Sequence, residues 1–483
     1  MAAAVVELPS VSIDAPYDSG PDGTITTIRQ FRLTLGDVTV ELSSLGASIT
    51  KVLLPRERKP DEDDNACDYK DDVVLSYASP KEQYSDRNRP YFGCIVGRVA
   101  NRIKDGRFSL RQQSSSSDAS STIESYQLET NNGPNHLHGG YDGFSNRIWD
   151  ASIVDNDTTV RFTLVSPDGD QGYPAGIEVV ASYSLVPIVR RDIDAGDNNT
   201  NEGATLRLVM TASLLPGETK ATPIGLAQHS YFNLSSHNSS KSRLNDHDLH
   251  MPNCLSYTPV DSTSIPTREV RHVDVSHDKA MSSQPLAMRL MYPSLNTQSA
   301  MDFRTKRDLA DVLHRYGVDQ VGLPLEEAAM NLVLEEEGIA LVPEGGGAMG
   351  SNLAGNAPYG FDHNYIIESS SEEESDDGMR LAASLFHDRT SRSLNVYTTA
   401  PGVQVYTANY LDGKSPAPEL CKDGATYRQW QGICLETQTF PDSILLDEDE
   451  LVKNDDAFAK GRCFVLRPGG ENYYHAVEYE FRI

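Results

Sequence analysis

Alternation of apolar and polar residues with a period of two dominates this chain. The segment FRLTLGDVTVEL carries an apolar residue at every second position on both sides of the Gly36-Asp37 pair. A two-residue loop that begins with glycine, between two alternating runs, is typical of a type II′ β-hairpin. Similar alternation covers 177–185, 206–210 and the C-terminal run 477–483. The pattern predicts an all-β protein with large stacked sheets.

The C-terminal run and two helical patterns complete the prediction of elements. Glu478, Glu480 and Arg482 alternate with apolar residues, which predicts a strand in a sheet with one face to water. Helical spacing of apolar residues is rare and occurs over 309–316. A second helix is expected over 324–338, between a proline suited to the first turn and a terminating glycine.

Several stretches have the composition of surface insertions, because they are acidic, serine-rich or glycine-rich and offer little apolar area to bury. They lie near 60–72, 112–124, 324–357 and 369–378. We expect solvated loops there. Residues 1–26 are expected to form a flexible tail, and 27–483 a single domain that contains the insertions.

The charge and the start of the chain limit the partners and the compartment. With 42 Lys and Arg against 70 Asp and Glu, the formal net charge is −28, which argues against nucleic acid and anionic membrane as partners. No stretch approaches the ~20 apolar residues that span a bilayer. The opening segment, MAAAVVELPSVSIDAPYDSG, lacks the basic region of a signal peptide and the arginines of a transit peptide. The expected compartment is the cytoplasm.

The sequence contains no complete motif for a metal site or a nucleotide site. The six cysteines include no C-x-x-C pair, so we expect reduced, mostly buried thiols. His136 and His138 would share one face of a strand, but a metal site needs further ligands. GGGAMG, at 345–350, matches a dinucleotide fingerprint but is followed by residues that form no helix. We therefore expect no metal and no cofactor.

Five other segments place polar groups among glycines and apolar residues. Glu436 stands in an apolar strand, where an ionised carboxylate is costly unless it is paired. Buried arginines, as GRVANRI would provide, need an anionic or polar partner. Each segment alone is compatible with a structural role. They are GRVANRI (97–103), GPNHLHGGYDGF (133–144), QHSYFNL (228–234), GFDHNY (360–365) and ICLETQTFPD (433–442).

Together with SPDGDQGYPAG (166–176) and TTAPGVQVYTAN (398–409), these segments closely resemble the aldose 1-epimerases, or galactose mutarotases. The resemblance runs from about Ile28 to the end of the chain. It implies a large antiparallel β-sandwich, the galactose mutarotase-like supersandwich, with few short helices. It also implies a small-molecule aldose as the partner and no cofactor. We expect a monomer, although no motif of the sequence fixes the oligomeric state.

The resemblance assigns roles residue by residue. It implies that His229 is the general acid and Glu436 the general base. Tyr231 and Phe232 are expected to help wall the pocket, and His136 falls outside the motif as a structural histidine. The implied contacts to sugar hydroxyls are Asn101, Arg102, His138, Tyr231, Asp362 and Gln404.

The implied function is the interconversion of the α and β anomers of free aldohexoses such as galactose and glucose. One acid and one base suffice for it. Three alternatives stay open: a catalytically silent sugar-binding or regulatory protein, a hexose-6-phosphate mutarotase, and a glycoside hydrolase that uses Asp362 and Glu436 as a carboxylate pair. The presence of both His229 and Glu436 favours catalysis. The segment 324–357, which is extra to the family pattern and ends just before Asp362, leaves the preferred sugar open.

Overall fold

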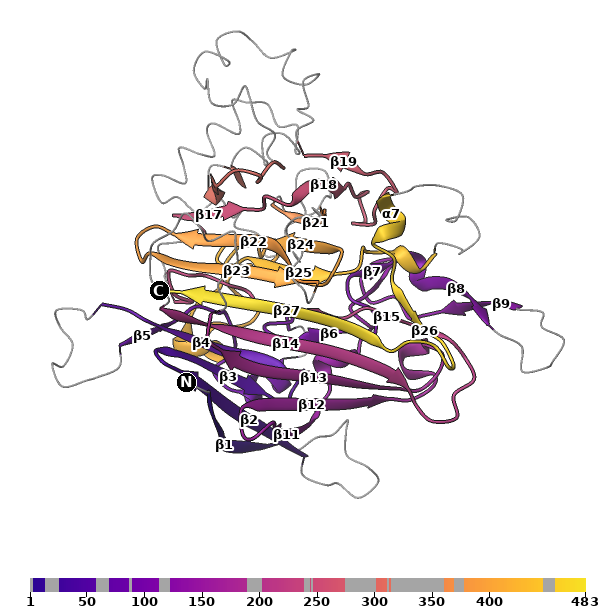
Figure 1. Ribbon diagram of the computed structural model, residues 1–483, viewed down its shortest axis with the longest axis horizontal. Helices are drawn as coiled ribbons and strands as arrows, with labels where there is room; N and C mark the ends of the chain where they lie inside the picture. Colours follow the sequence, from indigo (N-terminus) through magenta and orange to yellow (C-terminus); the bar gives the residue numbers. More distant parts are fainter. Residues whose placement is uncertain are drawn as a thin grey trace, which may run out of the picture.

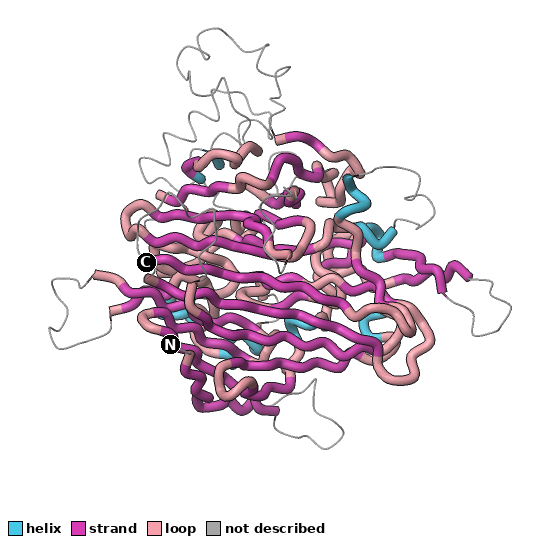
Figure 2. The backbone as a smooth tube through the Cα atoms, in the orientation of Figure 1, coloured by secondary structure: helices cyan, strands magenta, loops and turns pink. Residues whose placement is uncertain are grey.

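The computed structural model describes residues 3–13, 26–57, 69–86, 89–112, 122–188, 202–238, 244, 246–273, 301–310, 312–313, 360–368, 378–445 and 457–483. Within these residues strands dominate (Figure 2), and helices are short, such as α1 (Pro80–Ser85) and α7 (Ala457–Lys460). The prediction of an all-β protein is confirmed. No helix in this part of the chain has the length and apolar character needed to cross a membrane.

One large antiparallel sheet has nine strands, and its long strands run across the view in Figure 1. In spatial order they are β11 (Asp150–Val154), β12 (Thr159–Ser166), β13 (Ile177–Val186), β14 (Gly203–Leu214), β27 (Tyr473–Arg482), β23 (Arg392–Thr398), β22 (Arg380–His387), β17 (His247–His250) and β20 (Arg307–Asp308).

Two five-stranded sheets pack with it. One contains β1 (Ala4–Ile13), β2 (Thr26–Leu35), β3 (Val38–Ser43), β4 (Ser48–Pro55) and β5 (Lys70–Asp72). The other contains β19 (Arg271–His272), β18 (Cys254–Thr258), β21 (Asp362–Ile367), β24 (Gly402–Tyr406) and β25 (Cys434–Gln438). A single cluster of buried apolar residues joins all three sheets, as the predicted sandwich requires.

The predicted alternation is confirmed where it forms the core. Every second residue of β13, from Ile177 to Leu185, is buried, and β14 contributes Leu206, Leu208 and Met210 to the same cluster. The β2–β3 hairpin closes at the predicted pair, with Leu35 opposite Val38. Gly36 has φ 55°, the positive value that the first central residue of a type II′ turn requires.

The expectation of a water-facing side on β27 is wrong for Glu478 and Glu480, which are 6% and 2% exposed. β27 lies between β14 and β23, inside the nine-stranded sheet. Asn395 on β23 donates a hydrogen bond of 2.9 Å to Glu480, and Arg482 pairs with the same carboxylate at 2.7 Å. Polar side chains of neighbouring positions therefore shield the Glu480 carboxylate from water, and Arg207 on β14 lies 3.7 Å from Glu478.

The expected flexible tail is also wrong over 4–13, because these residues form β1 and pair with β2 along its length. Arg29 on β2 binds Glu7 of β1 through both carboxylate oxygens, at 2.7 and 2.8 Å. Residues 14–25 lie outside the described residues.

The expected insertions have a mixed outcome. Residues 70–72 form β5, and 112 and 122–124 belong to the hairpin of β8 (Arg107–Gln112) and β9 (Thr122–Gln127), so these parts are not loops. The segments 58–68, 113–121, 324–357 and 369–377, including the second predicted helix and GGGAMG, lie outside the described residues. Leu309, Val312 and Leu313 of the first predicted helix are helical and buried. Tyr316 is outside the described part.

The acidic residues of β5 bind buried cations. Lys422, only 5% exposed, donates to Asp72 Oδ2 at 2.5 Å and to the carbonyls of Thr50 and Val74. Arg392 donates to Asp71 Oδ2 at 2.8 Å. Burial lowers the pKa of Lys422, and the Asp72 carboxylate opposes this. The two aspartates fix β5 to the body of the protein.

We predict that Lys422→Met lowers the free energy of unfolding by about 3–5 kcal/mol, because it leaves the buried Asp72 carboxylate without its cation. Denaturant titration followed by circular dichroism measures the change. Lys51→Met is the control, because Lys51 pairs with Glu41 at 3.0 Å but is 38% exposed, and it should cost less than about 1 kcal/mol. Equal losses in both variants would contradict the role assigned to Lys422.

Candidate active site

The two residues expected to act as acid and base meet in the interior. Glu436 lies on β25, and His229 follows β16 (Ala227–Gln228). Reciprocal backbone hydrogen bonds between Phe232 and Ile433, of 2.8 and 3.0 Å, bring the two segments together. His229 Nε2 lies 3.5 Å from Glu436 Oε1, and the side chains are 5% and 3% exposed.

The surroundings of the pair oppose charge on either group. Burial lowers the pKa of His229 to about 4, while its own backbone carbonyl and Asp362 act in the opposite direction. Burial, with Asp362, raises the pKa of Glu436 well above its usual range, and Arg102 opposes this. The pair therefore favours a state with one shared proton and no net charge, and it titrates as a unit.

Glu436 has an unused hydrogen-bonding atom. Its Oε2 is buried and has no hydrogen-bond partner among the described residues. A buried carboxylate oxygen without a partner is costly, so this atom is available to a hydroxyl group of a ligand.

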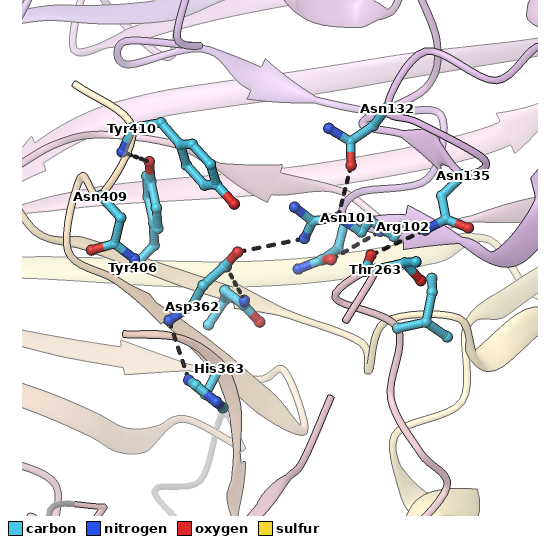
Figure 3. Close-up of polar contacts among 12 residues, drawn as sticks. Asn101, Arg102, Asn132, Asn135, Thr263, Asp362, His363, Tyr406, Asn409 and Tyr410 are labelled. Carbon is cyan, nitrogen blue, oxygen red and sulfur yellow. Dashed lines mark hydrogen bonds and ion pairs between the residues drawn. The ribbon is translucent and has the colours of Figure 1, made fainter. Parts of the chain in front are cut away.

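A second polar group lies beside the pair. It includes Arg102 and Asp362, which Figure 3 shows facing each other, and Gln404. Gln404 is directly opposite Glu436 on the neighbouring strand β24, and it donates a hydrogen bond of 2.6 Å to Asp362 Oδ1. Arg102 Nη1 lies 3.6 Å from Asp362 Oδ2, and its Nε donates to Asn132 at 3.1 Å. This network holds a guanidinium and a carboxylate in fixed orientations, which suits a ligand with several hydroxyl groups.

Asn101 and His138 hold each other in the left-handed backbone region, with φ of 59° and 51°. The backbone N–H of His138 donates to the carbonyl of Asn101 at 3.0 Å, and the N–H of Asn101 donates to His138 Nδ1 at 3.1 Å. The next residue must be glycine, because a Cβ on Gly139 would lie 1.8 Å from the carbonyl oxygen of Gly97. Asn101 Oδ1 accepts from the N–H of Arg102 at 2.9 Å.

The expectation that His136 and His138 share a strand face is wrong, because the positive φ turns the chain at His138. His138 packs against His229, with ring centroids 5.3 Å apart. His136 instead bonds the carbonyl of Glu129 at 2.7 Å and the Tyr173 hydroxyl at 2.9 Å. His136 is thus a satisfied structural histidine.

His138, His229 and Glu436 could form a metal site by distance alone, because three of their ligand atoms lie within 4.8 Å of one another. The hydrogen bond from Asn101 occupies His138 Nδ1, however, so neutral His138 carries its proton on Nε2. That nitrogen is then a hydrogen-bond donor and cannot bind a metal. The arrangement fits a ligand oxygen better than a cation.

Tyr231 and Phe232, the aromatic pair after His229, have different locations: Tyr231 lies at the site and Phe232 in the core. The Tyr231 ring stacks on His229 with centroids 5.1 Å apart, and its hydroxyl donates to the carbonyl of Pro90 at 2.8 Å. Its ring is therefore the part that contributes to the site. Phe232 packs on Tyr479 and Phe481 in the main core, so the expectation that it walls the pocket is wrong.

GRVANRI and SPDGDQGYPAG meet through Arg98, which is 1% exposed. Its guanidinium donates to the carbonyls of Pro174 and Ala175 and to the Ser166 hydroxyl, at 2.9, 2.8 and 2.5 Å. Burial lowers its pKa to about 10. Arg98 is structural, and its partners are polar atoms of the second motif.

Two site neighbours escaped the sequence reasoning. The Tyr91 ring lies 4.7 Å from His138 and 5.6 Å from His229. Cys434 Sγ lies 3.6 Å from His229 Nδ1. Cys434 could have been found, because it stands two residues before Glu436 and so shares its strand face. Tyr91 gave no periodic signal.

Known proteins are similar to this chain over most of its length. Residues 29–456 match the aldose 1-epimerase family. The chain is 30% identical over 457 residues to mouse galactose mutarotase, and equally so to the human protein, with 95% of each chain covered. It is 27% identical over 410 residues to the aldose 1-epimerase of Escherichia coli, with 85% of each covered.

Two solved structures show the same fold. One is an aldose epimerase homologue from C. elegans, with a TM-score of 0.58, 20% identity and coverage of 92% of this chain and 95% of that one. The other is the galactose 1-epimerase of Lactobacillus acidophilus, with a TM-score of 0.57, 22% identity and coverage of 98% and 99%. The predicted supersandwich is thereby confirmed.

We predict that dialysis against EDTA leaves the catalytic activity unchanged, because His138 presents a donor where a metal would need a lone pair. The activity is measured before dialysis, after it, and after addition of Zn²⁺ or Mg²⁺. A loss on dialysis that a divalent ion restores would contradict the assigned tautomer.

Proposed function

Because this chain belongs to the aldose 1-epimerase family, we propose that it interconverts the α and β anomers of free aldohexoses such as galactose and glucose. The observation that carries the proposal is the buried contact of 3.5 Å between His229 Nε2 and Glu436 Oε1. This contact supports the proposal, because it brings together the two groups to which we assign the roles of acid and base.

In the proposed reaction Glu436 removes the proton from the C1 hydroxyl, and the C1–O bond to the ring oxygen breaks. The electrons of that bond go to the ring oxygen, which takes a proton from His229, and C1 becomes an aldehyde carbon. Rotation about C1–C2 presents the other face, and the reverse steps close the ring. At the end both groups have regained their original protonation states. No step changes an oxidation state, so no redox group is required.

The remaining residues are assigned to binding. Arg102 and Asp362 offer a donor and an acceptor in fixed positions, and Gln404 holds Asp362. His138 offers its Nε2 proton, and the amide nitrogen of Asn101 has no hydrogen bond to the described residues. The Tyr231 ring limits the pocket beside His229.

The three alternative functions are weaker. A silent binding protein has no use for a buried acid–base contact. A hydrolase that uses Asp362 has to release it from Gln404 and Arg102. A phosphate-binding site needs a free cluster of cations, whereas Arg102 lies against Asp362.

We also propose that the protein is cytoplasmic and that it acts as a monomer. The five cysteines within the described residues are free and buried, as in proteins of a reducing compartment. Every proposed site residue comes from one chain, so the site needs no second copy to be complete.

Polarimetry tests the proposal directly. Addition of purified protein to fresh α-D-galactose or α-D-glucose should accelerate the change in optical rotation towards its equilibrium value. An unchanged rate with both sugars would refute the function. Product analysis with aryl galactosides and with hexose 6-phosphates separates the alternatives.

We predict that Glu436→Gln and His229→Asn each lower kcat by roughly 10²–10⁴-fold, the usual value of a positioned acid or base. KM should change little, because Arg102 and Asp362 hold the sugar. The double variant should lose less than the product of the single losses, since both groups act in one ring-opening step. A folded Glu436→Gln that keeps more than about a tenth of kcat would refute the assigned base.

The pH profile of kcat should be bell-shaped, because the active pair holds one proton. The acid limb should lie near pH 4. There the pair takes up its second proton, on His229, because burial lowers the pKa of this histidine to about 4. The alkaline limb should lie well above the ordinary carboxyl range, where the pair loses its last proton, because the pKa of Glu436 is raised. An acid limb near the ordinary histidine pKa would contradict this account.

A further inference from the structure

The His229 imidazole packs against two tyrosine rings, one stacked on it and one tilted against it. The Tyr231 ring is 5.1 Å away at an interplanar angle of 29°, and the Tyr91 ring is 5.6 Å away at 32°. The π face of an aromatic ring carries negative charge density, so it attracts a cation more than a neutral group. Both rings therefore favour the imidazolium form of His229.

Tyr91 occupies this place at a conformational cost. Its φ is 63°, in the left-handed region that a bulky residue rarely adopts. The segment is held there by Gly93, whose own φ is 68° and where a Cβ would lie 1.9 Å from the carbonyl oxygen of Ile49. Strained residues of this kind persist where the surrounding structure enforces them, and they cluster at functional sites.

The ring of Tyr91, and not its hydroxyl, makes the contacts with the site. The ring lies against His138 as well as His229, and it also packs on the apolar cluster of Val96, Ala100 and Ala227. Among the described residues, no hydrogen bond of the hydroxyl is found. A role through the hydroxyl is thus unsupported by the contacts.

We propose that Tyr91 is a positioning residue for His229, whose ring holds the imidazole towards Glu436 and stabilises its protonated form. The proposal rests on the proposed function, in which His229 donates a proton to the ring oxygen. Tyr231 makes the equivalent contact from the histidine motif itself, and Tyr91 adds a second from a different segment.

The other groups around His229 do not replace this contribution. Glu436 and Asp362 attract the imidazolium, but Glu436 gives up its charge readily in this buried site. Burial keeps His138 and Cys434 neutral, since it lowers the pKa of the first and raises that of the second. The Tyr406 ring is farther from His229, at 6.3 Å, and is not stacked on it, since the interplanar angle is 72°. The titratable and charged groups facing His229 are Glu436, Cys434, Asp362, Arg102, His138, Tyr91, Tyr231 and Tyr406.

The test compares Tyr91→Leu, which removes the ring, with Tyr91→Phe, which removes only the hydroxyl. Tyr91→Leu should lower kcat about tenfold, within the range of a desolvated cation–π contact, and should move the acid limb of the pH profile down by about one unit. Tyr91→Phe should keep kcat within about twofold and leave the limb in place. Tyr474→Leu, at a site 52% exposed on β27, controls for loss of a tyrosine and should match the wild type.

A second measurement separates this proposal from the proposed function. ¹⁵N NMR of the histidine ring nitrogens against pH reports the pKa of His229 without any turnover, so it stands even if the wild type shows no mutarotation. A lower His229 pKa in Tyr91→Leu than in Tyr91→Phe supports the proposal. An equal pKa in both, or an equal loss of kcat in both, overturns it. If Tyr91→Leu fails to fold, Tyr91→Met takes its place with the same outcomes.

Discussion

The burial of an acid and an imidazole against each other is the constraint on which the site depends. The side chains of His229 and Glu436 are almost inaccessible to solvent, and an isolated charge there would be costly. The pair avoids this cost by holding a single proton. Arg102 and Asp362 add one positive and one negative charge beside it, so the four groups together remain neutral. A polar ligand can then be held without an uncompensated buried charge.

The sandwich positions these groups through backbone pairing and not through long helices. Strands β21, β24 and β25 are neighbours in one sheet. The register of this sheet therefore determines the relative positions of Asp362, Gln404 and Glu436. His229 reaches them because the next segment of its chain bonds the residue just before β25. Asn101 and His138 lie in turns and have left-handed backbone conformations. Local hydrogen bonds and the neighbouring Gly139 stabilise these conformations.

The sequence predicted the features that depend on hydrophobic periodicity and on motifs. It did not predict the features that depend on contacts between residues far apart in the chain. The alternation of β13 identified its buried face because a strand inside a sandwich has a fixed side towards the core. Asp71 and Asp72 resembled a solvated acidic run because composition does not reveal cations 321 and 350 residues away. The family motifs indicated His229 and Glu436. Tyr91 stayed hidden because its contacts depend on a backbone angle that no spacing encodes.

The proton preference of the buried pair also bears on how the ring opens. Before opening, the proposed roles require a charged pair, a carboxylate on Glu436 and an imidazolium on His229. Once the proton has left His229 and another has reached Glu436, both groups are neutral, which is the state that burial favours. Desolvation therefore favours the open-chain state over the ring complex in which the pair is charged. The same pair closes the ring on either face, so this preference acts equally on both anomers and leaves the equilibrium between them unchanged.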